Sequence, residues 1–374
     1  MIERLYIHNF RCFENFELVL KEMPTALLLG TNGSGKSSIR QVLTILQRIG
    51  FGRSRLDQLL RPEDFGRGGK TLPIRFEIEA LISGRPYLYT LAVELSGDPA
   101  ELHVHEERLI AGGEPVYSRR QAEVTQHNAG GATESVFLID GKTIALSILQ
   151  GRNEPNDLGT FKNWLASMVV LAPIPSTMSG DSTGNEGWWQ AITDGSKFGE
   201  WFTWLIDTYP AADSIIEQSL RNQMPDFGKI SKIPVGPSIE RTERMSLSFR
   251  KDRAETSIAF PDLSDGEKCF LLGAVVVAMN KVFPSLVCFW DEPDNYLSLS
   301  EVGHFIMDLR RSFSAGGQLL ITSHNPEAIR KFSDENTLVL YRNSHLEPTQ
   351  VRRLEELSVH GDLVEALIRG DVGP

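Results

Sequence analysis

Hydrophobic residues form short unbroken runs that alternate with longer segments of helical periodicity. These runs lie within residues 26–29, 286–290, 318–321 and 337–341, of which the last two ranges begin with a polar residue. The segments with apolar side chains at helical spacing lie at residues 38–46, 269–280 and 300–313. A strand that is buried on both faces has a continuous apolar run, and helices cover the two faces of such a sheet. The pattern therefore predicts an α/β fold that contains a parallel sheet.

A second pattern, alternation of apolar and polar residues, fills much of the first 140 residues. Segments with strand character lie at residues 5–13, 16–20, 74–80, 87–95, 102–109 and 136–140, and the alternation is cleanest at 74–80. Alternation is typical of strands with one buried face, and the turn residues between these segments predict an antiparallel β module. The polar and glycine-rich stretch 112–134 is predicted to be a long mobile loop or hairpin tip.

Tryptophan is concentrated between residues 158 and 224, where the periodicity changes toward helix. Five of the six tryptophans lie there, namely Trp164, Trp188, Trp189, Trp201 and Trp204. We interpret them as the small core of a helical insert. The alternative is a surface that docks a partner or stacks nucleic-acid bases.

A glycine-rich motif follows the first buried run and precedes the first helical segment. It reads Gly30-Thr31-Asn32-Gly33-Ser34-Gly35-Lys36-Ser37, the G-x-x-x-x-G-K-[ST] pattern of a phosphate-binding loop, with Ser38 next in the helix. Glycines let backbone N–H groups turn inward around phosphate oxygens, and the helix N-terminus adds partial positive charge. Lys36 is predicted to reach the terminal phosphates and Ser37 to bind Mg²⁺. The plain structural alternative is a glycine-rich turn before an ordinary helix.

Polar residues end two of the other buried runs. Asp291 and Glu292 follow the run that ends at Trp290, and His324 follows the next one. Asp291 is a candidate Mg²⁺ ligand together with Ser37, and Glu292 is a candidate for polarising the attacking water. His324 is a candidate for contact with the γ-phosphate. Alone, the acidic residues are as often a plain strand-terminal pair, and a lone histidine is more often a structural residue.

The segment Leu263-Ser264-Asp265-Gly266-Glu267 resembles the signature loop of ABC-type ATPases, usually L-S-G-G-Q. Asp265 and Glu267 depart from that pattern in the manner of the SMC and RecF branch rather than of transporters. The opening phrase Ile7-His8-Asn9-Phe10-Arg11-Cys12-Phe13 also resembles that branch. By resemblance, Arg11 approaches the nucleotide, although an exposed cation at a strand end is its plain interpretation. The resemblance covers residues 1–50 and 240–345.

The resemblance implies an ATPase head with mixed parallel and antiparallel sheets plus a mainly helical insert. We expect an N-terminal lobe with the β module at 1–157, the insert at 158–235 and a C-terminal lobe at 236–374. Two chains would sandwich ATP and Mg²⁺, with Ser264, Gly266 and Glu267 of one chain facing the phosphate loop of the other. A glutamine that senses the metal is typical of the family, but neither Gln58 nor Gln150 is assigned to that role.

The likeness is greatest to compact SMC-like AAA ATPases related to the ATPase part of OLD-family nucleases, which often serve in bacterial anti-phage defence. Residues 37–263 between Lys36 and Ser264 are too few for long coiled-coil arms. About 50 residues after His324 are too few for a nuclease domain, so we expect a separate effector chain such as a nuclease or toxin. The resemblance thus implies a homodimer, or a higher oligomer of dimers, that controls a partner.

Composition adds constraints on location and ligands. The formal charge is −11. Cys12, Cys269 and Cys288 show no metal or redox spacing, so we expect these cysteines to be small buried residues. We expect a cytoplasmic protein without a membrane segment. A RecF-like repair ATPase that binds DNA is one alternative, because a basic tract runs through Arg40, Arg48, Arg53, Arg55, Arg61, Arg67 and Lys70. A scaffold that binds ATP without hydrolysing it is another.

Overall fold

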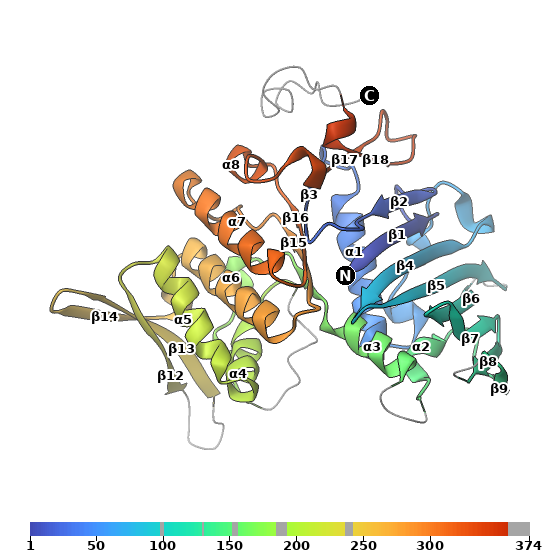
Figure 1. Ribbon diagram of the computed structural model, residues 1–374, viewed down its shortest axis with the longest axis horizontal. Helices are drawn as coiled ribbons and strands as arrows, with labels where there is room; N and C mark the ends of the chain where they lie inside the picture. Colours follow the sequence, from blue (N-terminus) through green and yellow to red (C-terminus); the bar gives the residue numbers. More distant parts are fainter. Residues whose placement is uncertain (98–100, 129–130, 152–155, 185–192, 236–241, 358–374) are drawn as a thin grey trace. The chain divides into compact units, whose positions relative to one another are not determined.

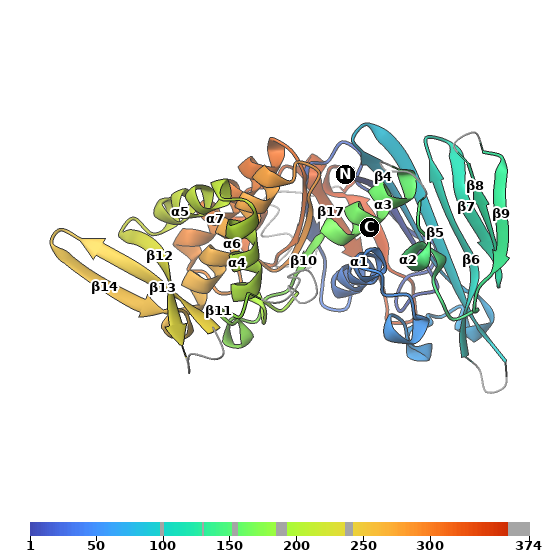
Figure 2. The same ribbon diagram turned by 90° about the horizontal axis from the view of Figure 1, so that it is seen from below.

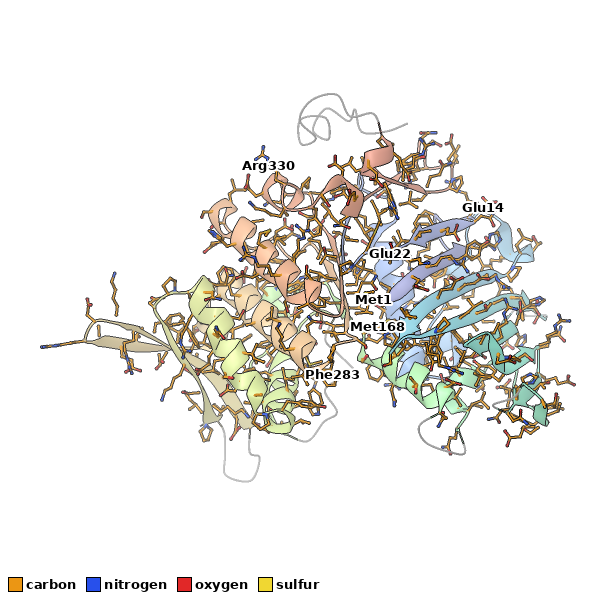
Figure 3. All side chains as sticks on the ribbon, in the orientation of Figure 1. Met1, Glu14, Glu22, Met168, Phe283 and Arg330 are labelled. Atoms are coloured by element: carbon orange, nitrogen blue, oxygen red, sulfur yellow. The ribbon has the colours of Figure 1, made fainter. Side chains whose placement is uncertain are left out.

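The structure, a computed structural model, describes residues 1–97, 101–128, 131–151, 156–184, 193–235 and 242–357. The chain divides into two compact units. Unit 1 comprises Met1–Met168 and Asp334–Pro374, and unit 2 comprises Val169–Ser333. Met168, labelled in Figure 3, therefore ends the first segment of unit 1. These boundaries differ from the three predicted segments, and each unit is described below by itself.

Unit 1 is built on an eight-stranded antiparallel sheet, seen in Figure 2 with helices α1, α2 and α3 along one side. Its strands in spatial order are β2 (Phe16–Val19), β1 (Ile2–His8), β4 (Ile74–Ile82), β5 (Arg85–Ser96), β6 (Glu101–Ala111), β7 (Glu114–Arg120), β8 (Glu123–His127) and β9 (Thr133–Leu138). Strand β4 alternates buried and half-buried residues along its whole length, as its sequence predicts. The antiparallel β module is therefore confirmed.

The prediction of a mobile loop at residues 112–134 is wrong, because β7, β8 and the start of β9 occupy it. The inward-facing side chains of these strands include Tyr117, Arg119 and Val124, all nearly fully buried. Arg119 is buried because Glu107 of β6 lies 3.6 Å from its guanidinium and backbone carbonyls accept its N–H groups. A buried arginine at a core-facing position conceals the alternation that identifies a strand.

A second group of strands in unit 1 surrounds the predicted phosphate loop. Strand β3 (Thr25–Leu29) is fully buried and pairs in parallel with β17 (Thr337–Tyr341), which pairs antiparallel with β18 (Gln350–Arg353). The helices of this unit are α1 (Lys36–Gly50), α2 (Ala145–Ile148) and α3 (Asp157–Ser167). Helix α3, which lies in the predicted insert, instead packs on α1, where a Cβ on Gly50 would lie 2.5 Å from the Ala166 nitrogen.

Unit 2 contains three parallel strands and a helical layer. The strands are β10 (Val169–Leu171), β15 (Val287–Asp291) and β16 (Gln318–Thr322). The helices are α4 (Phe198–Thr208), α5 (Ala211–Gln223), α6 (Asp265–Val282), α7 (Leu299–Ser314) and α8 (Pro326–Ile329). Helices α5, α6 and α7 lie side by side (Figure 1). Strand β10 interrupts the predicted helical region because its three apolar residues pair with β15.

A small antiparallel sheet completes unit 2. Its strands are β11 (Asp181–Ser182), β12 (Phe227–Val235), β13 (Thr242–Lys251) and β14 (Ala254–Ala259), and β13 pairs with each of the others. Trp201 of α4 is 0% exposed, in agreement with the core interpretation of the tryptophans. Trp164 is also buried, at 4% exposed, but it lies on α3 of unit 1. Trp188 and Trp189 lie outside the described residues.

The cysteines agree only in part with the sequence prediction. Cys269 and Cys288 are buried, and burial raises the pKa of the Cys269 thiol to about 12. Cys12 is half-buried and lies in a turn rather than in a strand, because β1 ends at His8 and Phe10 and Phe13 exchange backbone hydrogen bonds. Within the described ranges, none of the helices has the length and apolar character required to cross a membrane.

Candidate functional site

The glycine-rich loop lies between the end of β3 and the start of α1 in unit 1. Gly33 and Gly35 have positive φ angles of 80° and 108°, which residues with a side chain rarely adopt. A Cβ on Gly35 would lie 2.8–2.9 Å from the Phe13 ring and the Cys12 sulfur. The φ angle of Gly35 and the close packing of the turn at residues 10–13 thus both require glycine at this position.

The end of this loop has the properties of an anion site. Gly35 caps α1 without a side-chain hydrogen bond, and the first turn of α1 has no acidic residue. The N–H groups and the partial positive charge of the helix N-terminus are therefore not neutralised by the helix itself. The Ser34 hydroxyl is buried and has no hydrogen-bond partner among the described residues. A buried hydroxyl without a partner at a helix N-terminus fits a phosphate oxygen.

Lys36 and Ser37 supply the two other groups predicted for a nucleotide. The Lys36 ammonium crosses the loop and donates to the carbonyls of Gly30 and Thr31, at 2.5 and 3.3 Å. Ser37 is exposed, so its hydroxyl is accessible to a metal ion. The residues present fit a nucleotide phosphate with Mg²⁺, since Mg²⁺ prefers hard oxygen ligands together with substrate phosphates.

Arg11 lies on the turn that packs against Gly35, but its charge is already paired. Its guanidinium lies 3.0 Å from the Asp64 carboxylate, which is 6% exposed, and the Arg11 N–H donates to the Asp64 carbonyl. The φ angle of Arg11 is 54°, an unusual value for a residue with a side chain. The predicted nucleotide contact of Arg11 stays a prediction, and its partner Asp64 was not identified from the sequence.

A further cation beside the loop was missed by sequence reasoning. Strand β17 runs parallel to β3, with Val339 opposite Leu29, so the residues after both strands meet at one sheet edge. Arg342 follows β17 there, and a Cβ on Gly33 would lie 2.8 Å from its Nη2 atom. The sequence feature that could have identified Arg342 is its position directly after the apolar run 337–341.

The acidic pair lies at the carboxyl end of β15 in unit 2. The Thr322 hydroxyl of β16 donates to Asp291 Oδ1 at 2.6 Å and accepts from the Glu292 N–H at 2.9 Å. Thr322 therefore fixes the positions of both acidic residues. It can do so because Asp291 and Thr322 are neighbours on the paired parallel strands. Glu292 has a φ of 53°, a strained backbone conformation of the kind that clusters at functional sites. Sequence reasoning did not identify Thr322.

His324 lies beside Glu292, so these two predicted residues are brought together. The His324 Nε2 atom is 3.7 Å from Glu292 Oε1, and Asn295 donates to Glu292 Oε2 at 2.5 Å. The side chains of His324 and Glu292 are 47% and 34% exposed, so both can reach a ligand. Asn295 holds the carboxylate in a defined orientation, as a group that positions water requires.

Asp294 is a second, buried carboxyl group next to this cluster. It is 4% exposed, and Oδ1 has no hydrogen-bond partner among the described residues. Burial raises its pKa to about 6, the nearby charge of Glu292 acts in the same direction, and a hydrogen bond with Ser323 opposes them. The loop 291–295 thus contains a carboxyl group whose pKa is raised by burial.

The predicted signature segment forms the N-terminus of α6. Ser264 caps this helix: its hydroxyl accepts from the Glu267 N–H, and the Glu267 carboxylate accepts from the Ser264 N–H at 2.7 Å. Glu267 is therefore engaged within its own helix turn. A Cβ on Gly266 would lie 3.2 Å from the Tyr296 carbonyl, so the segment packs against the loop that follows Glu292. The structure thus brings Ser264–Glu267 close to that loop within unit 2.

The predicted residues are therefore divided between the two units. The phosphate loop and Arg11 belong to unit 1, whereas Asp291, Glu292, His324 and the signature segment belong to unit 2. Among the unassigned glutamines, Gln58 ends a short 3₁₀ turn and Gln150 follows α2, and both are exposed. The nucleotide-binding, catalytic and metal roles of all these residues remain predictions.

Two protein-family models match separate segments of the chain. Residues 1–62 match a family model described as "AAA ATPase domain", and residues 208–330 match one described as "AAA domain, putative AbiEii toxin, Type IV TA system". The first match contains the phosphate loop, and the second contains the signature segment, Asp291, Glu292 and His324. No curated protein matches the chain.

Solved structures of SMC heads show the same fold. One, an SMC head bound to the C-terminal winged-helix domain of ScpA, is 15% identical with a TM-score of 0.58, and the match covers 95% of this chain and 99% of that one. Another, an SMC head with an extended coiled coil bound to the C-terminal domain of ScpA from Pyrococcus furiosus, is 14% identical with a TM-score of 0.55, covering 95% and 97%. The chain has an SMC-head-like α/β fold with mixed parallel and antiparallel sheets, which confirms the predicted fold class.

Proposed function

We propose that this protein binds Mg²⁺-ATP and hydrolyses it to ADP and phosphate. The observation that carries this proposal is the phosphate loop, with its uncapped helix, its unpartnered Ser34 hydroxyl and Lys36 folded across it. The SMC-head-like fold and the two AAA-type segments support the same activity. Lys36 and the loop amides would hold the phosphates, and Ser37 and Asp291 would hold Mg²⁺, which neutralises charge on the phosphates.

The hydrolytic role in this proposal belongs to residues of unit 2. Glu292 would orient the attacking water and accept its proton, because it is a partly exposed carboxylate fixed by Asn295. His324 would contact the γ-phosphate from its position 3.7 Å from Glu292.

We further propose that ATP closes a homodimer. The signature segment would contact the γ-phosphate held by a second copy, and phosphate release would reopen the pair. The N-terminus of α6 suits an anion, although the Ser264 hydroxyl donates to the Glu267 carboxylate at 2.8 Å and Asp265 and Glu267 add negative charge to this turn. Opening and closing would then control a separate effector chain.

The role of that effector is proposed to be bacterial anti-phage defence. The support is the family resemblance of the motifs and the match of residues 208–330 to a model whose description names a toxin–antitoxin system. The two SMC heads compared above are bound to a partner protein, which supports control of a separate chain. Purification of the protein from its native host, with identification of co-purifying chains, tests this part. A co-purifying nuclease or toxin is the expected result.

The dimer and the ATPase activity are tested together with Ser264→Arg. Mg²⁺-ATP should convert the wild type to a dimer in sedimentation velocity, with phosphate release above background. Ser264→Arg should keep the affinity of the monomer for labelled ATP within about threefold but show no ATP-driven dimer. Thr256→Arg, in the exposed strand β14, is a control that should behave like the wild type. ATP-induced dimers of Ser264→Arg would refute the contact in trans, and a wild type that binds no ATP would refute the whole proposal.

A further inference from the structure

The turn after β17 passes next to the phosphate loop. Thr349 N–H donates to the Cys12 carbonyl and β18 pairs with β17, so both ends of the turn are anchored within unit 1. A Cβ on Gly33 would lie 2.8 Å from Arg342 Nη2 and 3.8 Å from His345 Nε2. Gly30 is equally close to this region, because its Cβ would lie 2.5 Å from the Leu340 carbonyl. The turn is therefore part of the loop's immediate surroundings.

The charge of Arg342 has no counterpart in these surroundings. Within the residues that the structure describes, no carboxylate pairs with its half-buried guanidinium and no acceptor takes its hydrogen bonds. The one carboxylate of the turn, Glu347, accepts from the Asn343 amide at 3.0 Å instead. Arg67 adds a second cation, because it donates to the His345 carbonyl. A guanidinium without an acceptor, held against a glycine of an anion-binding loop, fits a missing anionic ligand.

We propose that Arg342 is a phosphate-binding residue of the nucleotide site. It would donate to an oxygen of the β- or γ-phosphate from the Gly33 side of the loop. The inference rests on the proposed ATP binding and deepens it, since it adds a contact supplied by the last part of the chain. Gly33 leaves room for this contact, because any side chain there would displace the guanidinium. Arg67 holds the turn through the His345 carbonyl and is a positioning residue.

The test compares Arg342→Ala with Arg342→Lys and with the control Arg352→Ala. Arg352 lies on the neighbouring strand β18 over the Tyr341 ring, so its removal also deletes an exposed cation but not one beside the loop. Binding of fluorescent ATP and ADP is measured by titration, and tripolyphosphate, which has no adenosine, is used as a competitor. A charge-assisted hydrogen bond to phosphate predicts that Arg342→Ala binds ATP about 10- to 100-fold more weakly, with the same loss for ADP if the contact is to the β-phosphate and none if it is to the γ-phosphate. Arg342→Lys should recover part of the loss.

Tripolyphosphate separates a phosphate contact from a contact with the base or ribose. It should compete with the labelled nucleotide on the wild type and on Arg352→Ala, and about 10-fold less well on Arg342→Ala. An ATP affinity of Arg342→Ala within twofold of the wild type would overturn the inference. An unchanged competition by tripolyphosphate would also overturn it. If the wild type itself binds no ATP, the proposed function fails, so the two failures are distinguishable.

Discussion

Replacing Glu292 with glutamine should stop ATP turnover while it leaves binding intact. The glutamine side chain has the same size, and its carbonyl oxygen can still accept the hydrogen bond that Asn295 donates to Oε2 at 2.5 Å. The change removes the negative charge and the basic oxygen 3.7 Å from His324. Because this side chain is 34% exposed and its main contact is retained, the fold should lose less than about 0.5 kcal/mol.

The expected effect on rate follows from the role of a general base. A positioned base contributes about 10²- to 10⁴-fold, or about 3–5 kcal/mol of activation free energy. The steady-state rate of phosphate release at saturating Mg²⁺-ATP should therefore fall by at least 100-fold. The ATP-bound dimer should persist longer in sedimentation, because hydrolysis no longer opens it. The affinity for ATP should stay within about threefold of the wild type.

A matched control replaces a glutamate with glutamine at a position away from the candidate site. Glu255→Gln lies in the exposed strand β14, where Glu255 pairs with Arg250, and it should hydrolyse ATP at the wild-type rate. Turnover of Glu292→Gln within twofold of the wild type would refute the assignment of Glu292 as the base. Loss of ATP binding in the same variant would show that Glu292 acts on the bound nucleotide before the chemical step.

Two predictions concern stability. Burial raises the pKa of Asp294 from 3.8 to about 6, so the folded protein keeps a proton that the unfolded chain releases, and the wild type loses up to about 3 kcal/mol as pH rises from about 4 to above 6. Asp294→Asn should therefore melt at a higher temperature than the wild type at pH 7.5 but not at pH 4, and an equal difference at both would contradict this. Glu107→Ala should lower the free energy of unfolding in urea by about 3–5 kcal/mol, because it leaves the fully buried Arg119 unpaired and two N–H groups of α2 without an acceptor. The exposed Glu123→Ala is its control, and a loss below about 1 kcal/mol would refute the role of the buried pair.

The sequence predicts best those elements whose residues are apolar wherever they are buried. The elements that begin and end close to their predicted limits are β3, α1, β15 and β16. Their buried positions are apolar, so the sequence shows directly which residues are buried. Strands β7 and β8 were missed because a buried arginine, neutralised by Glu107 on another strand, has no hydrophobic signal. Strand β10 was missed because three apolar residues directly after a helix carry no turn signal.

The candidate site divides in a similar way. Gly30–Ser37 form a contiguous motif, so local sequence alone predicts the loop and its glycine conformations. Thr322, Asn295 and Arg342 become visible only when strands are placed side by side or a loop is folded back. The roles of these three residues depend on groups that are close in space after folding. A single polar residue has no recognisable pattern in one sequence. Arg11 illustrates the opposite case, since its cation was noticed but its partner Asp64 was not.

The pairing of β17 with β3 has a consequence for how the protein is made. Thr337 lies opposite Leu27, so the two strands are 310 residues apart (337 − 27) and the whole of unit 2 is translated between them. The ribosome must translate all of unit 2 before β3 can gain this neighbour and before Arg342 can approach Gly33. Such a long-range pairing is slow to form and costly in loop entropy. The surroundings of the phosphate loop are therefore completed only after unit 2 has been translated, and a chain truncated before residue 337 would carry the loop motif without the strand that supports it.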